Sequence, residues 1–376
     1  MALAPLPLGP NQPPRFYRGG AGIARLRGTP APSDHVPEDL VASTTELSGG
    51  GGAGLTVLAD GTTLRDAIAA DPLAYLGPRH VDRFGADLAL LVKLLDTAER
   101  LVVHFHPSRE FAGKHLHSCH GKTEAWIITD VTASPGDATA GQVYLGFRED
   151  LSLATVRQWV DAQDKAALLG ALNEVPVRPG DTCLVPAGVP HAIGAGITLV
   201  EVQEPTDFSI MLEWKGFAID GPSEGHLGLG FGLALQALDL TGWDQARLRG
   251  LLGTGHGEPR PETPPRAGVT RLLPAEADDF FRVERVESRG RDADGFPDAG
   301  GFHGREDFSP QVAVLVVLDG RGRLSWDGGT LPLSRGATVL VPYGAGPTRI
   351  DGQVSLLRCM PPDPDAQTTG TTSTTH

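Results

Sequence analysis

Two histidines one residue apart, His104 and His106, are the first residues of this chain whose types and spacing could do chemistry. In a β-strand the side chains of residues i and i+2 lie on one face, so a strand over residues 101–106 would direct both imidazoles to the same side. A carboxylate follows at Glu124. Two imidazoles and a carboxylate are a ligand set for Zn, Mn, Fe or Co, so we predict a metal site here. Three further histidines of the same stretch are interpreted as solvated loop residues: His115, His117 and His120.

A second segment, GDTCLVPAGVPHAIGAGI from Gly180, supplies a further histidine. Gly180 begins a hairpin turn, residues 182–185 form a short apolar strand, and Pro186 and Gly188 turn the chain toward His191. This spacing resembles the second sequence motif of the cupin β-barrels, in which such a histidine enters the barrel opposite the first pair. The predicted set of three neutral nitrogens and one carboxylate leaves positions open for substrate or water. The predicted metal ligands are His104, His106, Glu124 and His191.

The composition excludes several classes of function. The formal charge is −14, with 32 basic against 46 acidic residues, which argues against a general affinity for nucleic acid or an anionic membrane. Three widely spaced cysteines indicate no disulfide framework and fit a reducing cytoplasm, where we expect the protein to be located. We expect no signal peptide in the proline-broken N-terminus and no membrane span, because no apolar run approaches 18 residues. The sequence leaves the oligomeric state open.

The sequence predicts a mainly β fold of two cupin (jelly-roll) β-barrels with a helical insertion between or beside them. Abundant glycine (49) and proline (31) are typical of many short strands joined by turns. The segment GATVLVPYGAG (336–346) repeats the shape of the first barrel's motif but has no histidine, so the second barrel is predicted to bind no metal. The predicted organisation is a flexible N-terminus at 1–14, a metal-binding barrel at 15–220 with a helical insertion at 152–172, a helical connector at 221–256, a linker at 257–268, a second, degenerate barrel at 269–362 and a disordered tail at 363–376.

Local patterns predict the individual elements. Alternating apolar and basic residues around glycines predict edge strands over 16–28, and DGRG at 319–322 predicts a hairpin turn. Helical spacing predicts helices over 64–70, 72–76, 152–172, 233–240 and 243–252. Short apolar runs predict strands over 39–45, 88–95, 123–131, 142–147, 198–202, 210–214, 311–318, 323–326, 329–333 and 338–341.

The motif order resembles that of the class I mannose-6-phosphate isomerases. The motifs are LLVKLLD (90–96), HFHP (104–107), GKTEAW (121–126), VPAGVPHAIGAG (185–196), VEVQEPTD (200–207) and GHLGLGF (225–231). The resemblance implies a cupin fold and one divalent metal, with Zn first and Mn, Co or Fe as alternatives. It also implies interconversion of mannose 6-phosphate and fructose 6-phosphate, with a small-molecule sugar or sugar phosphate as the partner. The metal ligands implied are the same four residues, with His104 where the family typically has glutamine. The resemblance places Glu201 at a glutamate proposed in proton transfer and Lys122 at a lysine tied to substrate binding.

Two departures concern the substrate phosphate. Val102 stands where the family often has serine, and Met211 where it has an arginine near the phosphate. Either other basic residues replace these groups or the substrate carries no phosphate. The candidate replacements are Arg18, Arg25, Arg109, Lys114, Arg148 and Lys215.

Aldose–ketose isomerisation moves a proton between C2 and C1 through a cis-enediol, whose developing oxygen charge a divalent metal stabilises. Glu201 is the first choice for the proton-transfer base and Lys122 the second; alternatively, Glu201 orients a ligand histidine. Lys93, inside an apolar run, is expected to place its ammonium at the barrel rim.

Two other functions compete with the isomerase. One is an iron dioxygenase, which the 17 residues between His106 and Glu124 disfavour because the common dioxygenase motif places its glutamate much nearer. The other is a non-catalytic sugar-binding cupin, which the substitutions at Val102 and Met211 would allow.

Overall fold

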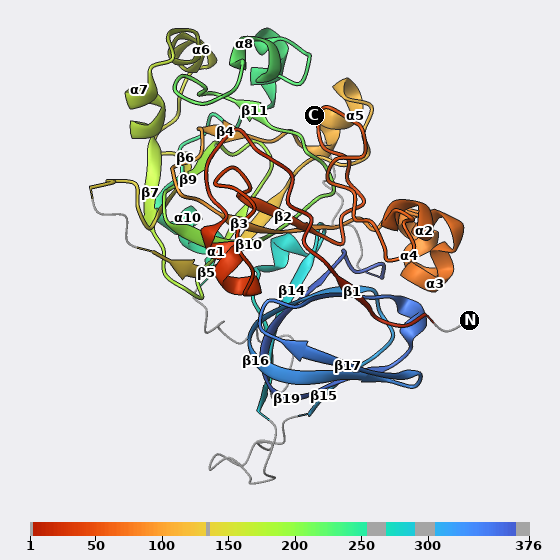
Figure 1. Ribbon diagram of the computed structural model, residues 1–376. Coiled ribbons are helices and arrows are strands. Elements are labelled where there is room, and N and C mark those ends of the chain that lie inside the picture. Colours follow the sequence, from red (N-terminus) through yellow and green to blue (C-terminus); the bar gives the residue numbers. More distant parts are fainter. Residues whose placement is uncertain (1–2, 133–135, 254–267, 290–304, 366–376) are drawn as a thin grey trace.

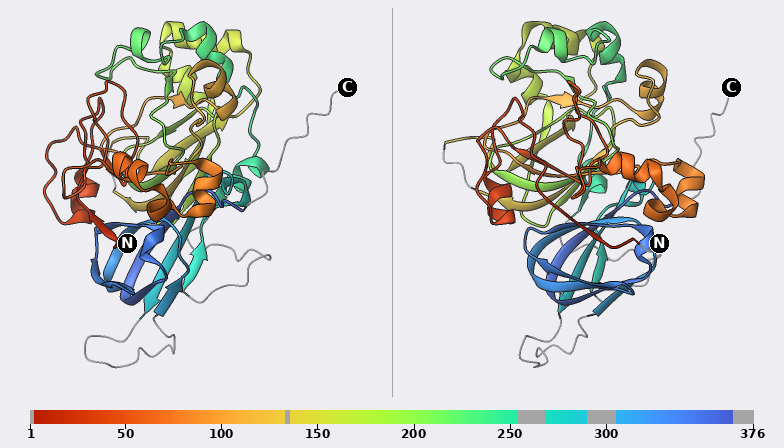
Figure 2. Two further views of the ribbon diagram at one scale, coloured as in Figure 1. Left: turned by 90° about the vertical axis from the view of Figure 1, so that its right-hand side faces the viewer. Right: turned by 45° about the vertical axis from the view of Figure 1, so that its right-hand side comes forward.

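The computed structural model describes residues 3–132, 136–253, 268–289 and 305–365 of the chain. Most of its regular structure is β, arranged as two β-rich bodies one beneath the other (Figures 1 and 2). The predicted mainly β fold is therefore confirmed. Among the described residues, no helix is both long and apolar enough to cross a membrane.

The first body consists of two facing antiparallel sheets. The six-stranded sheet has the order β12 (Leu252–Gly253), β8 (Thr182–Val185), β5 (Glu124–Val131), β10 (Ile197–Gln203), β3 (Leu91–Asp96) and β2 (Glu38–Val41). The five-stranded sheet has the order β11 (Ile210–Met211), β4 (His104–Phe105), β9 (His191–Ile193), β6 (Gln142–Phe147) and β7 (Leu172–Pro176).

The two-residue period of the strands separates an interior face from an exterior face. In β10, Leu199 packs inside the first body, whereas Val200 and Val202 belong to a core on the other side of the sheet. Glu201 lies between Val200 and Val202, so its carboxylate takes the interior side with Leu199. The same period turns Phe105 of β4 outward, onto a core made with helices α6 (Leu153–Ala162) and α7 (Lys165–Gly170), and leaves the flanking histidines facing in.

The second body is an eight-stranded antiparallel sheet that curls around its own apolar core (Figure 1). Its main path is β1 (Leu6–Leu8), β18 (Thr338–Val341), β16 (Ala313–Trp326), β19 (Thr348–Met360), β14 (Arg282–Arg289) and β13 (Val269–Arg271); β15 (Arg305–Phe308) pairs with β19 and β17 (Gly329–Ser334) with β16. One apolar core joins the two bodies, because Val92 and Val200 of the first belong to the same cluster as Val314 and Leu357 of the second.

Helices cover the sheets at three places. The six-stranded sheet and the second body share a core with α2 (Leu64–Ala70) and α3 (Pro72–Leu76), which are followed by α4 (Pro78–Phe84). The outer face of the five-stranded sheet packs against α6 (Leu153–Ala162), which Ser152 caps, α7 (Lys165–Gly170) and α9 (Phe231–Ala234). The remaining helices are α1 (Ala21–Arg27), α5 (Arg109–His115), α8 (Gly221–Glu224), α10 (Gln245–Leu251) and the 3₁₀ turns η1 (Leu235–Ala237), η2 (Ala275–Ala277) and η3 (Tyr343–Ala345).

The strands predicted over 16–28 are wrong, because helix α1 occupies 21–27. Ile23 and Leu26 are three residues apart and both buried, which is the spacing of one helix face. Gly22 lets the helix lie directly on the sheet, since a Cβ there would come within 2.2 Å of Thr198 and Asp96 side-chain atoms. Gly28 ends the helix with φ 69°.

The hairpin turn predicted at 319–322 is also wrong. Strand β16 continues through these residues to Trp326, and the turn lies at residues 327–328, where Trp326 pairs with Gly329. Glycine at position 320 allows β19 to approach closely, because a Cβ on Gly320 would lie 2.1 Å from the Gln353 carbonyl oxygen.

Residues at both chain ends differ from the expectation of disorder. Strand β1 pairs with β18, so residues 6–8, predicted to be loosely ordered, complete the edge of the second body. At the other end, Arg83 donates to the carbonyl oxygens of Asp363 and Pro364. The predicted linker at 257–268, apart from Gly268, and the tail beyond residue 365 lie outside the described residues.

The three cysteines should differ sharply in reactivity. Cys119 is exposed, whereas burial raises the pKa of the Cys183 and Cys359 thiols to about 12. Since the thiolate is the reactive form and a raised pKa keeps both buried thiols protonated at pH 8, a thiol reagent should modify only Cys119 in the native protein and all three after unfolding. Peptide mass spectrometry would check this, and labelling of Cys183 before unfolding would contradict it.

Candidate metal centre and active site

The structure brings His104, His106 and His191 together inside the first body. His104 on β4 pairs in register with His191 on β9, and the two Nε2 atoms lie 3.0 Å apart. Ligand atoms of all three imidazoles lie within 4.8 Å of one another. From β5, Glu124 places Oε2 3.0 Å from His106 Nε2 and Oε1 3.4 Å from His191 Nε2. The three histidines predicted as ligands therefore form one group, and the fourth predicted ligand, Glu124, lies beside His106 and His191.

Backbone carbonyl groups fix the orientation of each imidazole. The Nδ1 atom of His104 lies 2.9 Å from the Val102 carbonyl oxygen, that of His106 lies 2.7 Å from Phe208, and that of His191 lies 2.8 Å from Val189. A carbonyl oxygen only accepts, so each Nδ1 carries the proton and each Nε2 offers a lone pair. Three lone pairs directed at one point repel one another unless a cation lies between them.

Burial favours the neutral imidazoles that a metal requires. Burial lowers the pKa of His104 and His191, and it lowers that of His106 to about 3, with the Lys122 ammonium adding to the effect. Burial alone would raise the pKa of Glu124, but Lys122 and His106 hold it well below its usual range. Three neutral nitrogens and an ionised carboxylate are a donor set that fits a divalent cation.

Two neighbours on β5 and just before it contact the Glu124 carboxylate. Lys122 Nζ lies 3.0 Å from both Glu124 Oε2 and His106 Nε2. Trp126, which is fully buried, donates its indole N–H to Glu124 Oε1 at 2.9 Å. These contacts hold the buried carboxylate in place.

Lys93 does not lie at the barrel rim as expected. Its side chain is 3% exposed, and its ammonium lies 3.4 Å from Glu201 Oε1 and 3.7 Å from Glu38 Oε2. Burial alone would lower the pKa of Lys93, but the two carboxylates raise it. Burial raises the pKa of Glu201, and Lys93 only partly offsets this effect. The lysine faces inward because residues 91–96 alternate, and Val92 and Leu94 take the exterior side.

Replacing Lys93 with methionine should destabilise the protein by about 3–5 kcal/mol, because two buried carboxylates lose their shared cation. Urea unfolding would measure the loss. Lys114→Met, on an exposed position of α5, is the matched control and should change stability by no more than about 0.5 kcal/mol. A loss below about 1 kcal/mol in the Lys93 variant would contradict the inferred role of the lysine.

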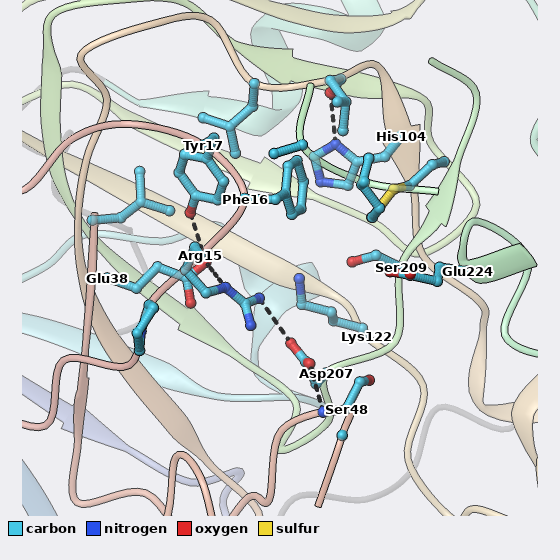
Figure 3. A pocket seen from close by; sticks show the side chains of 18 of the residues that line it. Arg15, Phe16, Tyr17, Glu38, Ser48, His104, Lys122, Asp207, Ser209 and Glu224 are labelled. Atoms are coloured by element: carbon cyan, nitrogen blue, oxygen red, sulfur yellow. Dashed lines mark hydrogen bonds and ion pairs between the residues drawn. The ribbon is translucent and has the colours of Figure 1, made fainter. Parts of the chain in front are cut away.

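Sequence reasoning missed a second group of charges on the same wall, shown in Figure 3. Glu38 Oε1 accepts from the Tyr17 hydroxyl at 2.6 Å and from Arg15 Nε at 3.1 Å. Arg15 Nη2 donates to Asp207 Oδ1 at 3.1 Å, and Asp207 Oδ2 accepts from the Ser48 amide at 3.1 Å. Charged residues at 38 and 207 beside short apolar strands were the available signal, but their mutual approach is not encoded locally.

This second group lines a cavity of about 890 Å³ together with His104, Lys93, Lys122, Glu124 and Glu201. Val102 and Met211, the two departures from the family pattern, also line it. None of the six basic residues considered as phosphate ligands does: for example, Arg18 pairs with Glu99 at the surface and Arg109 with Glu204. The sequence prediction of those candidates is wrong for this cavity, because basic character alone does not indicate which way a side chain faces.

The expectation of three solvated loop histidines holds only in part. His117 is exposed. His115 ends helix α5 and is half-buried against Phe111. The prediction that His120 is solvated is wrong, because its Nε2 lies 2.6 Å from Asp87 Oδ2.

Residues 19–128 match the family model "Phosphomannose isomerase type I, catalytic domain". The family resemblance is confirmed over these residues. The matched segment contains His104, His106, Lys122 and Glu124, whereas His191 and Glu201 come from later strands.

Two curated relatives and one solved structure extend the comparison. The chain is 35% identical over 140 residues to the mannose-6-phosphate isomerase of Streptococcus mutans and 34% identical over 136 residues to ManA, the mannose-6-phosphate isomerase of Bacillus subtilis. These alignments cover 36% and 35% of this chain, and 41% and 37% of the relatives' lengths. The crystal structure of a mannose 6-phosphate isomerase from Bacillus subtilis superposes with a TM-score of 0.69 at 21% identity, covering 95% of this chain and 99% of that one, so the whole fold is shared.

Proposed function

We propose that this chain is a metal-dependent aldose–ketose isomerase that interconverts mannose 6-phosphate and fructose 6-phosphate through a cis-enediol. The observation that carries the proposal is the grouping of three imidazoles with the Glu124 carboxylate beside a large cavity, which His104, Glu124 and Glu201 line. The match of residues 19–128 to the type I catalytic domain supports the substrate pair, as do the names of the relatives.

The proposed metal is one divalent ion, Zn first, held by His104, His106, His191 and Glu124. When bound, it would act as a Lewis acid for the sugar oxygens on which charge develops. The carbonyl groups that hold each Nδ1 keep the rings oriented, and the buried site limits competition from water for the ligands.

The proposed proton carrier between C2 and C1 is Glu201. Its carboxylate lines the cavity, and its Oε1 lies 3.4 Å from the Lys93 ammonium. The environment raises its pKa, which makes it a better base than an exposed glutamate. The ion pair with Lys93 keeps the Glu201 carboxylate in position. Lys122, beside Glu124, is proposed to bind substrate oxygens and is the second choice for the proton carrier.

Turnover of metal-loaded protein on mannose 6-phosphate tests the proposal. Zn-loaded protein should produce fructose 6-phosphate and exchange the C2 hydrogen with solvent, because the base removes the C2 proton of the aldose to form the enediol and can exchange it before returning a proton to C1. Activity with a redox-inactive metal would also exclude oxygen chemistry. Absence of turnover on any aldose would favour a non-catalytic sugar-binding protein instead.

A further inference from the structure

The cavity wall carries an excess of negative charge. Five carboxylates and three side-chain cations line it, a net formal charge of −2. A divalent metal would bring the wall only to neutrality. The carboxylates are Glu38, Glu124, Glu201, Asp207 and Glu224, and the cations are Arg15, Lys93 and Lys122.

Each of the three cations already has a carboxylate partner. Lys122 lies 3.0 Å from Glu124, and Lys93 lies within 3.7 Å of both Glu38 and Glu201. Arg15 supplies the single guanidinium among the described residues of the lining. Guanidinium groups are well suited to phosphate because their planar fork donates two parallel hydrogen bonds. Arg15 is therefore the group on which phosphate recognition would depend.

Two carboxylates already engage Arg15. Its Nε donates to Glu38 and its Nη2 to Asp207, each at 3.1 Å. Both side chains of the Arg15–Asp207 pair are largely buried, at 19% and 12% exposed, so solvent screens this pair weakly. Burial alone would raise the pKa of Asp207, but Arg15 holds it below the usual range, so the carboxylate is charged at neutral pH. The Ser48 amide fixes the other Asp207 oxygen.

We propose that Asp207 is a specificity-determining residue: by occupying Arg15, it disfavours a substrate phosphate, so that the cavity also accepts unphosphorylated aldoses. This inference rests on the proposed isomerase function. A phosphate dianion that approaches Arg15 must either displace Asp207 or lie beside its negative charge, and like charges at close range weaken binding. An uncharged sugar meets neither cost and can use the same polar side chains as hydrogen-bond partners.

The test is the ratio of kcat/KM for mannose 6-phosphate to kcat/KM for mannose, measured in the metal-loaded protein and in Asp207→Asn. Asparagine keeps an oxygen for the Ser48 amide but removes the charge. The wild-type ratio should not exceed about 10³, and Asp207→Asn should raise the ratio at least about tenfold, mainly through a lower KM for the phosphate ester. A smaller rise, or a wild-type ratio above about 10³, would overturn the proposal.

Glu99→Gln is the matched control. It removes one carboxylate that pairs with Arg18 outside the cavity, so it changes the net charge of the protein equally. Its ratio should equal that of the wild type. An equal rise in both variants would assign the effect to overall charge and contradict a role for Asp207.

A second measurement needs no variant. Mannitol and mannitol 1-phosphate differ only in the phosphate and cannot isomerise, so calorimetry on metal-loaded wild-type protein compares their binding directly. Dissociation constants within about tenfold of each other support the proposal, and a stronger preference for the phosphate ester contradicts it. Turnover of neither sugar would refute the proposed isomerase itself, whereas turnover with a strong phosphate preference would refute only the role of Asp207.

Discussion

Alanine in place of His106 or His191 is expected to remove the bound metal and to lower kcat/KM by at least about 10³-fold. Each substitution deletes one Nε2 that converges on the site, and alanine supplies no ligand atom in its place. The loss corresponds to about 4 kcal/mol of transition-state stabilisation, since each 1.36 kcal/mol is a factor of ten. Metal content by elemental analysis, measured on the same samples as turnover, checks both halves of the prediction.

His117→Asn is the control for this prediction. His117 is exposed and has φ 54°, a left-handed conformation that asparagine tolerates. This variant should retain its metal and its activity. If His106→Ala kept stoichiometric metal in the same site, the ligand assignment would be refuted, whatever its effect on turnover.

The second large effect is expected from Glu201→Gln, which should lower kcat by about 10²–10⁴-fold while the metal stays bound. Glutamine preserves the shape of the side chain but cannot take up the proton from C2. Solvent exchange of the C2 hydrogen should fall in parallel with turnover. Stopped exchange with full metal content would distinguish a base from a group that supports the metal ligands.

Two other results for Glu201→Gln would assign this residue a different role. Loss of metal together with activity would mean that the carboxylate supports the ligand set, which was the alternative considered from the sequence. Activity within about tenfold of the wild type would exclude Glu201 as the base. Lys122 would then be the residue to substitute, since it also lines the cavity beside Glu124.

The four proposed ligands could be predicted from the sequence because each depends on local geometry. The i, i+2 spacing of His104 and His106 specifies one strand face, and the turn before His191 specifies where the chain re-enters the barrel. Helices α2 and α3 were predicted with the observed bounds, since Thr63 and Asp71 cap them and Pro72 begins the second.

Prediction of secondary structure from the sequence failed where one residue pattern was compatible with two kinds of local structure. Residues 16–28 place apolar and basic side chains around glycines, from which edge strands were predicted, yet Ile23 and Leu26 share a helix face. The packing of Gly22 against Thr198 and Asp96 decided between the two. At 319–322, turn-forming residues lie within a strand because Gly320 permits a close crossing with β19.

By itself, the sequence determined which residues are proposed as metal ligands, the β-rich character and the family resemblance, because strand periodicity and turn spacing act over a few residues. Only the tertiary structure decided which charges surround that set. Lys93 lies between Glu38 and Glu201, and Arg15 reaches Asp207 across 192 positions of the chain. Such contacts depend on how distant strands and loops are brought together around a buried cavity, where low dielectric makes each pairing of charges strong. No local pattern encodes that arrangement.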